Sequence, residues 1–372
     1  MPHDDADPIL RLAADLIAID SRSSVSNLAV AERIESELAG FEVERLDWTD
    51  PNGVPKRALV AHRGPGEGGV AFAAHMDTVP PAGWLRDPFR PVIENGFLHG
   101  LGAVDMKGPL AAAIVAARAA PRDLAVTLLL TFDEETTKDG ARLIAERSEL
   151  VRRARPKGIV VAEPTGMRCV RGHRVHVQFT ATARGVQAHS ASGRGENANL
   201  RLIPFLAELL PIHARLREDP AFLDAAYDPP FCDFNIVIDN HGAAPNVAVG
   251  LATAHVKFRY GRRTDPSPIV AAVRAAAERA RVELAERWEG EPPELPSEHP
   301  LVRAAVAETG RDAVTAPFGT DAVHLQRIAP TIVLGPGELM TAHTAEERVA
   351  IADLAAAPAL LLRLAERVAA LP

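Results

Sequence analysis

Three apolar segments in the first half of the chain constrain the fold most. VAFAA (70–74), LAVTLLLTF (124–132) and KGIVVA (157–162) carry almost no charge. Continuous runs of this kind are typical of strands that are buried on both faces of a parallel sheet. Between them, residues 108–120 and 139–154 carry apolar residues at helical spacing. Strand and helix therefore alternate, which predicts an α/β domain with a mostly parallel, helix-covered sheet.

The pattern changes after residue 168. Residues 173–184 (HRVHVQFTATAR) alternate between apolar and polar side chains, as a half-exposed antiparallel strand does. Two helices and further strands are expected up to residue 288, and the Pro-rich EGEPPELPSEHP (289–300) is expected to lead back to the first domain. We therefore predict an inserted α+β domain over 169–290 and a discontinuous catalytic domain over 1–168 and 291–372.

The remaining helices and strands are expected at either end of the chain. Helices are predicted at 7–18, where Asp7 is a suitable N-cap and Pro8 a suitable first residue, and at 27–39. The other expected elements are a strand at 57–62, a helix at 299–309, a strand at 330–334 and a helix at 350–370.

Composition excludes several classes of partner. The net charge is −8 over 372 residues and no basic block stands out, which argues against nucleic acid and anionic membrane surfaces. The longest apolar runs are too short to span a bilayer. The acidic segment MPHDDADPIL lacks the pattern of a signal peptide. Cys169 and Cys232 cannot build a disulfide framework and are expected to be reduced, buried thiols. A cytoplasmic protein is therefore predicted.

Polar clusters follow the predicted strands of the α/β domain. The carboxyl ends of strands in open α/β sheets are where ligands bind. Each residue taken alone is more often a turn residue, a helix start or a solvated charge, but five clusters together favour a site. Histidine and carboxylate ligands without thiolates suit a hydrolytic Zn²⁺ or Co²⁺ site, and their number suggests two ions. The clusters contain His75, Asp77, Asp105, Asp133, Glu134, Glu135, Glu163 and His343.

The order of these motifs resembles one known family. HxD, GxGxxDMKG, DEE, EPT and a C-terminal AH occur in this order in the M20-type metallopeptidases. That family includes acetylornithine deacetylase, succinyl-diaminopimelate desuccinylase, aminoacylase and the folate-cleaving carboxypeptidase. The resemblance covers nearly the whole chain and implies two Zn²⁺ per subunit, with Co²⁺ as a possible substitute. It also implies that the inserted domain is a lid through which two subunits form a homodimer.

The resemblance assigns roles to the metal-site residues. His75 and Glu163 would bind one ion, Glu135 and His343 the other. Asp105 would bridge both ions, and Asp77 would orient the His75 ring. Glu134 would be the general base that takes a proton from the bridging water and delivers it to the leaving amine.

The inserted domain would supply substrate contacts. His189, in GVQAHSASGRGENAN, matches the lid histidine that donates to the developing carbonyl oxyanion, often from the partner subunit. Arg174, Arg259 and Asn246 are candidates for the substrate carboxylate. Both arginines could equally be surface charges on strands.

The substrate is predicted less sharply than the reaction. FGTD (318–321) resembles the FGTEA segment of acetylornithine and acetylcitrulline deacetylases, with Asp321 in place of glutamate. We therefore expect hydrolysis of a small N-acyl amino acid such as N-acetylornithine or N-acetylcitrulline. Two alternatives stay open: a desuccinylase or a di- or carboxypeptidase of the same family, and a non-catalytic protein that kept the fold.

Overall fold

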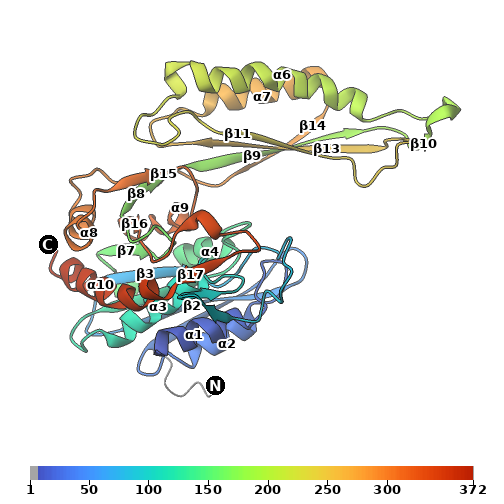
Figure 1. Cartoon of the computed structure of the whole chain (residues 1–372). Coiled ribbons are helices and arrows are strands. Elements are labelled where there is room, and N and C mark those ends of the chain that lie inside the picture. Colours follow the sequence, from blue (N-terminus) through green and yellow to red (C-terminus); the bar gives the residue numbers. More distant parts are fainter. Residues whose placement is uncertain (1–6, 372) are drawn as a thin grey trace. The chain divides into compact units, whose positions relative to one another are not determined.

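A computed structural model describes residues 7–371, which form two compact units (Figure 1). Unit 1 contains the chain up to Gly172, Pro293–Val314 and the chain from Thr320 onward. Unit 2 contains His173–Pro292 and Thr315–Gly319. The short segment 315–319, which the sequence placed in the catalytic domain, is thus part of unit 2.

The apolar segments of the first half are neighbouring strands in unit 1. β3 (Val70–His75) and β6 (Val126–Thr131) are buried at every position. They run parallel to each other and to β7 (Gly158–Val161) and β16 (Thr331–Val333) in the centre of an eight-stranded sheet. The predicted α/β class is confirmed, because the strands with continuous apolar sequence are the parallel ones.

Three of the outer strands, β1, β2 and β8, pair antiparallel, a feature that the sequence did not predict. The order is β1-β2-β6-β3-β7-β16-β8-β15. β2 is antiparallel to both β1 and β6, and β8 is antiparallel to β16. The outer strands are β1 (Glu42–Thr49), β2 (Pro55–Arg63), β8 (Val170–His173) and β15 (Val314–Ala316).

Helices cover both faces of the sheet (Figure 1). One face shares a single apolar core with five helices, and Phe72 and Leu128 belong to that core. These helices are α1 (Pro8–Ile17), α2 (Leu28–Glu35), α3 (Lys107–Ala119), α8 (Pro300–Thr309) and α10 (Ile351–Ala369). The other face is covered by α4 (Asp139–Arg147), α5 (Glu149–Ala154) and α9 (Ala322–Leu325). The start of α1 is as predicted, since Asp7 accepts a hydrogen bond from the Ile9 N–H at 3.1 Å.

The single helix predicted over 139–154 is wrong. The chain leaves the helical conformation at Ser148, and the Ser148 hydroxyl accepts a hydrogen bond from the Val151 N–H at 3.0 Å. Glu44 of β1 accepts a hydrogen bond from the same hydroxyl and another from the Glu149 N–H at 2.9 Å. Ser148 therefore caps a new helix, α5, a position that serine favours.

A small three-stranded sheet lies beside the large one in unit 1. Its order is β17-β5-β4, with β4 (Val92–Glu94), β5 (Phe97–His99) and β17 (Arg348–Ala350). A short 3₁₀ helix, Leu339–Thr341, precedes β17. The pairing of β17 with β5 brings the segment after His343 to the loop that follows residue 99.

Unit 2 is an antiparallel sheet with helices on one face (Figure 1). The strand order is β11-β13-β9-β14, and burial alternates along β9 as the sequence predicted. These strands are β9 (Val175–Arg184), β11 (Phe234–Asp239), β13 (Leu251–Tyr260) and β14 (Glu283–Trp288). The helices are α6 (Asn199–Glu218) and α7 (Ser267–Ala280), and a small pair is formed by β10 (Ala188–His189) and β12 (Val247–Ala248). Short 3₁₀ turns occupy Ser190–Ser192 and Pro220–Phe222.

No helix within residues 7–371 combines the length and the apolar character needed to cross a membrane.

Candidate metal centre

The five predicted metal ligands converge in unit 1. Three of them lie at the ends of central strands: His75 is the last residue of β3, Glu135 comes shortly after β6, and Glu163 comes shortly after β7. Asp105 lies in the loop before α3, and His343 lies in the loop between β16 and β17. Because β3, β6, β7 and β16 are parallel and adjacent, their carboxyl ends open at the same edge of the sheet.

Asp105 lies between the two histidines. Its Oδ1 atom is 3.1 Å from His75 Nε2, and its Oδ2 atom is 3.2 Å from His343 Nε2. Each histidine also meets a glutamate, because Glu163 Oε1 is 3.6 Å from His75 Nε2 and Glu135 Oε1 is 3.1 Å from His343 Nε2. The Asp105 carboxylate thus faces two pairs of side chains, and each pair consists of one histidine and one glutamate. This arrangement is expected of a ligand that bridges two metal ions.

Two groupings of potential ligand atoms share His75. In His75, Asp105 and Glu135 the ligand atoms all lie within 4.8 Å of one another, and the same holds for His75, Glu134 and Glu163. The second grouping contains Glu134, which the sequence assigned to proton transfer. Glu134 therefore lies directly beside the predicted ligands His75 and Glu163, close enough to serve a water molecule there.

The site concentrates acidic groups away from solvent. Burial, reinforced by the charge of Asp105, raises the pKa of Glu135 to about 7 and raises the pKa of Glu163 well above its ordinary value. Burial would lower the pKa of His75, but its hydrogen bonds to Asp105 and Asp77 outweigh burial and raise that pKa well above its usual range. Hydrogen bonds to Asp105 and Glu135 raise the pKa of His343 to about 11. A divalent cation would balance these carboxylates, so the residues present fit a metal centre.

Asp77 holds two parts of the site together. It is fully buried, and its Oδ1 atom lies 3.5 Å from His75 Nδ1. The same carboxylate accepts hydrogen bonds from the backbone N–H groups of Glu134 at 3.1 Å and Glu135 at 3.3 Å, and from the Ser23 hydroxyl at 2.7 Å. The Asp77 backbone carbonyl lies closer to His75 Nδ1, at 3.0 Å, so the ring is held by the main chain as well as by the carboxylate. The carboxylate also binds the loop that carries Glu134, a contact that the sequence did not predict.

Two polar residues next to the site, Lys138 and Asp321, were not assigned a role from the sequence. Lys138 Nζ lies 3.1 Å from Glu134 Oε1, and both side chains are buried. Asp321 accepts a hydrogen bond from Thr131, the last residue of β6. Burial and the charge of Glu134 raise the pKa of Asp321 to about 8. The match of FGTD to FGTEA singled out Asp321, but no local pattern connected it with Glu134.

The other predicted site residues lie in unit 2. His189 is exposed on β10, and its Nδ1 atom accepts a hydrogen bond from the Ala191 N–H at 3.2 Å. Asn246 lies beside it, since the Asn246 carbonyl accepts from the Ser190 N–H at 2.9 Å. The structure thus brings these two residues together within unit 2.

The two arginines differ in their surroundings. Arg174 is 1% exposed, stacks 4.7 Å from the Tyr227 ring and donates to the Pro229 carbonyl at 2.7 Å. Arg259 is half-buried on β13, where its Nε atom lies 3.9 Å from Asp233. Burial lowers the pKa of Arg174.

Comparisons with known proteins agree with this site. Residues 71–367 match the model of peptidase family M20/M25/M40. The chain belongs to this family. It is 31% identical to an acetylornithine deacetylase of Klebsiella pneumoniae over 329 residues, which cover 83% of this chain and 82% of the relative. It is 30% identical to an acetylornithine deacetylase of Erwinia tasmaniensis over 306 residues, which cover 78% of this chain and 77% of that protein.

The fold is also similar to that of a solved structure. A Saccharomyces cerevisiae dipeptidase superposes with a TM-score of 0.78 at 15% identity, over 98% of this chain and 96% of that one. The M20/M25/M40 assignment confirms the predicted metal-dependent amidohydrolase as a class.

Proposed function

We propose that this chain hydrolyses the amide bond of a small N-acyl amino acid, with N-acetylornithine or N-acetylcitrulline as the substrate class. The observation that carries the reaction is Asp105, whose two oxygens face His75 and His343 beside Glu134. The substrate class is supported by two relatives named acetylornithine deacetylase, which are 30% and 31% identical.

Two divalent ions would be held by the predicted ligands. His75 and Glu163 would hold one, His343 and Glu135 the other, and Asp105 both. We propose zinc, with cobalt as a substitute, because imidazole and carboxylate ligands suit these ions. When bound, the ions would polarise the substrate carbonyl and lower the pKa of water.

The chain's own residues would move the proton. Glu134 accepts a proton from the attacking water and passes it to the nitrogen of the leaving amine as the C–N bond breaks. Its backbone is held by Asp77, and its Oε1 atom lies 3.1 Å from Lys138 Nζ. The backbone carbonyl and the carboxylate of Asp77 lie 3.0 Å and 3.5 Å from His75 Nδ1, and together they would orient the ring so that Nε2 is directed at Asp105.

Unit 2 would complete the site. We assign His189 as the donor to the carbonyl oxygen that becomes negative, and Asn246, Arg174 and Arg259 as contacts to the substrate carboxylate. His189 and Asn246 are the best-supported of these residues, because both are exposed and they lie next to each other. His189 is in β10, and Asn246 directly precedes β12, the strand that pairs with β10. Arg174 could take part only if its buried stack on Tyr227 opened, which makes Arg259 the better-placed arginine.

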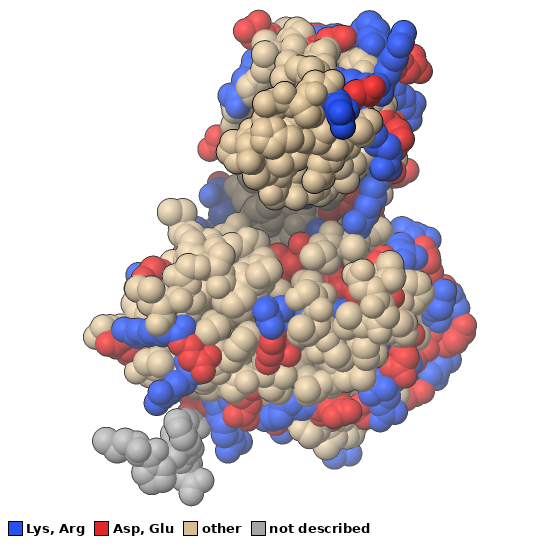
Figure 2. All heavy atoms as spheres, turned by 90° about the vertical axis from the view of Figure 1, so that its right-hand side faces the viewer, with Lys and Arg blue, Asp and Glu red and all other residues tan. Residues whose placement is uncertain are grey.

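A second copy of the chain is the proposed partner of unit 2. Leu200, Ile203 and Leu210 form an apolar stripe on α6 and are 70%, 58% and 65% exposed. β11 is an edge strand with free pairing positions, which another chain can extend. Figure 2, seen from the side of β10, shows mostly uncharged residues on the facing end of unit 2. These features support a homodimer through this unit.

A substrate panel tests the proposal. Zinc-loaded protein is assayed with N-acetylornithine, N-acetylcitrulline, N-succinyl-diaminopimelate and simple dipeptides, and the released amine is measured. We expect the highest kcat/KM for an N-acetyl amino acid. A preference for a dipeptide or for the succinyl compound would replace this proposal with the corresponding alternative.

Glu134→Gln is the matched control for this panel. The amide keeps the shape of the side chain but cannot accept a proton, so kcat should fall by at least the roughly 10²–10⁴-fold that general base catalysis contributes. Metal content should be unchanged. A variant that keeps more than about a tenth of wild-type kcat would remove Glu134 from this role.

A further inference from the structure

A buried glutamate outside the predicted ligand set contacts the loop that carries Asp105. Glu347 is 1% exposed and lies four residues after His343. Its Oε1 atom accepts hydrogen bonds from the backbone N–H groups of Val104 at 3.1 Å and Asp105 at 3.0 Å. One carboxylate oxygen therefore binds two consecutive N–H groups at the bridging ligand.

This carboxylate depends on backbone donors. Its hydrogen bonds come from the backbone N–H groups of the Asp105 loop, while the buried Lys107 interacts with it only through its charge. A buried carboxylate is costly unless it is hydrogen-bonded, and N–H groups that donate to a charge form strong bonds. The bonds to Val104 and Asp105 consequently hold Glu347 and the loop in one arrangement.

The segment 343–347 contacts Asp105 at two points. His343 Nε2 meets the Asp105 side chain at 3.2 Å, and Glu347 meets the Asp105 backbone at 3.0 Å. The segment is anchored directly afterwards, where β17 pairs with β5 and Arg348 lies opposite His99. The Glu347 carbonyl also accepts from the Gly100 N–H at 3.3 Å, so both ends of the 100–105 loop are fixed to it.

We propose that Glu347 is a positioning residue of the metal centre, which fixes the loop of the bridging Asp105 relative to His343. The inference rests on the proposed two-metal function and adds a residue to it. Glu347 does not touch the ligand atoms, so its effect is on how well the ligand set is arranged before an ion binds. Partners of this kind typically contribute 10–100-fold to metal affinity.

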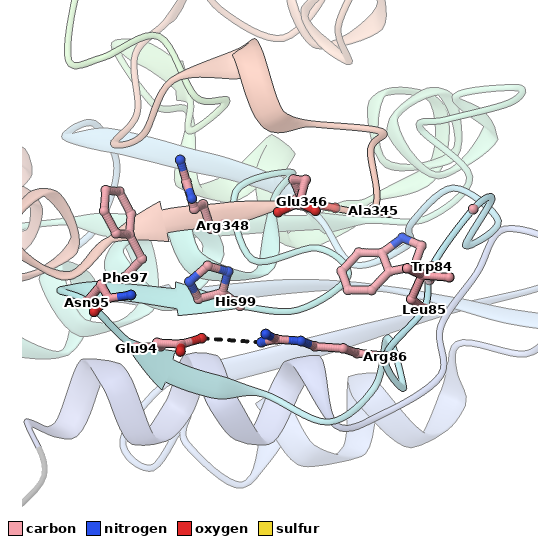
Figure 3. A pocket seen from close by; sticks show the side chains of 12 residues that line it. Trp84, Leu85, Arg86, Glu94, Asn95, Phe97, His99, Ala345, Glu346 and Arg348 are labelled. Carbon is pink, nitrogen blue, oxygen red and sulfur yellow. Dashed lines mark hydrogen bonds and ion pairs between the residues drawn. The ribbon is translucent and has the colours of Figure 1, made fainter.

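The chain supplies a matched control next to Glu347. Glu346 is exposed and lines a surface pocket of about 500 Å³ together with Arg348 and Trp84 (Figure 3). Both glutamates line this pocket, but Glu346 is exposed, whereas Glu347 is buried and accepts the hydrogen bonds from the Asp105 loop. A substitution at Glu346 therefore removes a carboxylate from the same segment without removing the bonds to Val104 and Asp105.

Zinc affinity of four metal-free proteins tests the proposal: wild type, Glu347→Met, Glu347→Gln and Glu346→Met. Each is titrated with zinc against a chromophoric chelator, and its thermal unfolding is recorded without metal. We expect Glu347→Met to bind at least one of the two ions about 10–100-fold more weakly. Glu347→Gln should stay within about threefold of wild type, because the amide oxygen still accepts both N–H bonds. Glu346→Met should match wild type.

The outcomes separate the inference from the proposed function. Wild-type affinity in Glu347→Met, or equal weakening in Glu347→Gln and Glu347→Met, would overturn the positioning role while the two-metal site stands. A wild-type protein that binds no zinc would overturn both. If Glu347→Met does not fold, Glu347→Asp takes its place: the shorter side chain withdraws the acceptor oxygen, and unchanged affinity would again refute the proposal.

Discussion

Replacing Asp77 by asparagine should loosen the metal centre and the fold together. Asp77 Oδ1 accepts from the Glu134 N–H and faces His75, while Oδ2 accepts from the Glu135 N–H and the Ser23 hydroxyl. An amide has only one acceptor oxygen. The hydroxyl can turn and accept instead, but a backbone N–H cannot. In either orientation of the amide, one N–H in the DEE loop therefore faces another donor.

The size of the effect follows from these contacts. A buried donor left without an acceptor costs about 1–3 kcal/mol, so the free energy of unfolding of the metal-free protein should fall by about that amount. Loss of the carboxylate charge 3.5 Å from His75 Nδ1 should weaken zinc binding about tenfold, the lower end of the range for such partners, because the backbone carbonyl of residue 77 still accepts from that ring at 3.0 Å. Urea unfolding in the presence of EDTA gives the first quantity, and chelator competition gives the second.

Ser23→Ala is the control for this prediction, because it removes a single partner of Asp77. It should cost about 1 kcal/mol or less and leave zinc affinity close to wild type. If Asp77→Asn proved as mild as Ser23→Ala in both measurements, the reasoning that Asp77 joins the His75 ring to the DEE loop would be refuted.

Three further predictions concern other parts of the chain. Lys56 and Asp133 form a buried ion pair at 2.7 Å. Lys56→Met leaves Asp133 without this partner and should lower the free energy of unfolding, measured with urea, by about 3–5 kcal/mol. A loss below about 1 kcal/mol would contradict this prediction. Burial raises the pKa of Cys169 to about 12 and also raises that of Cys232, so little thiolate exists at pH 8, and a thiol-reactive dye should label both only after denaturation; rapid labelling of native protein would disprove this. Ile203→Asp on α6 should convert a dimer to a monomer in light scattering at micromolar concentration, and an unchanged dimer would exclude this stripe from the interface.

The central part of the fold could be predicted from the sequence because its signals are local. β3 and β6 are continuous apolar runs, and every residue in them is buried. β1 was not predicted, because its sequence EVERLDWT places charged residues among the apolar ones and its position depends on pairing with β2. The break at Ser148 was also missed, since Glu44, which accepts from the Ser148 hydroxyl, is 104 residues away in the sequence.

The metal ligands could be predicted for a similar reason. His75 ends a strand, Glu163 follows one, and the order of the motifs resembles a known family. The supporting residues carry no such signal. Glu347 binds the Asp105 N–H across 242 residues, and Lys56 binds Asp133 across 77. Such contacts are set by the tertiary fold, so a single sequence shows the ligands but not what orients them.

The number of zinc ions bound per chain tests the central claim most directly. Metal-free protein is saturated with zinc and freed of unbound ions, and its metal and protein contents are then measured. The two-metal account predicts two equivalents for wild type, and about one for a variant that loses a ligand of a single ion, such as Glu163→Gln. Less than one equivalent bound to folded wild-type protein would contradict the account.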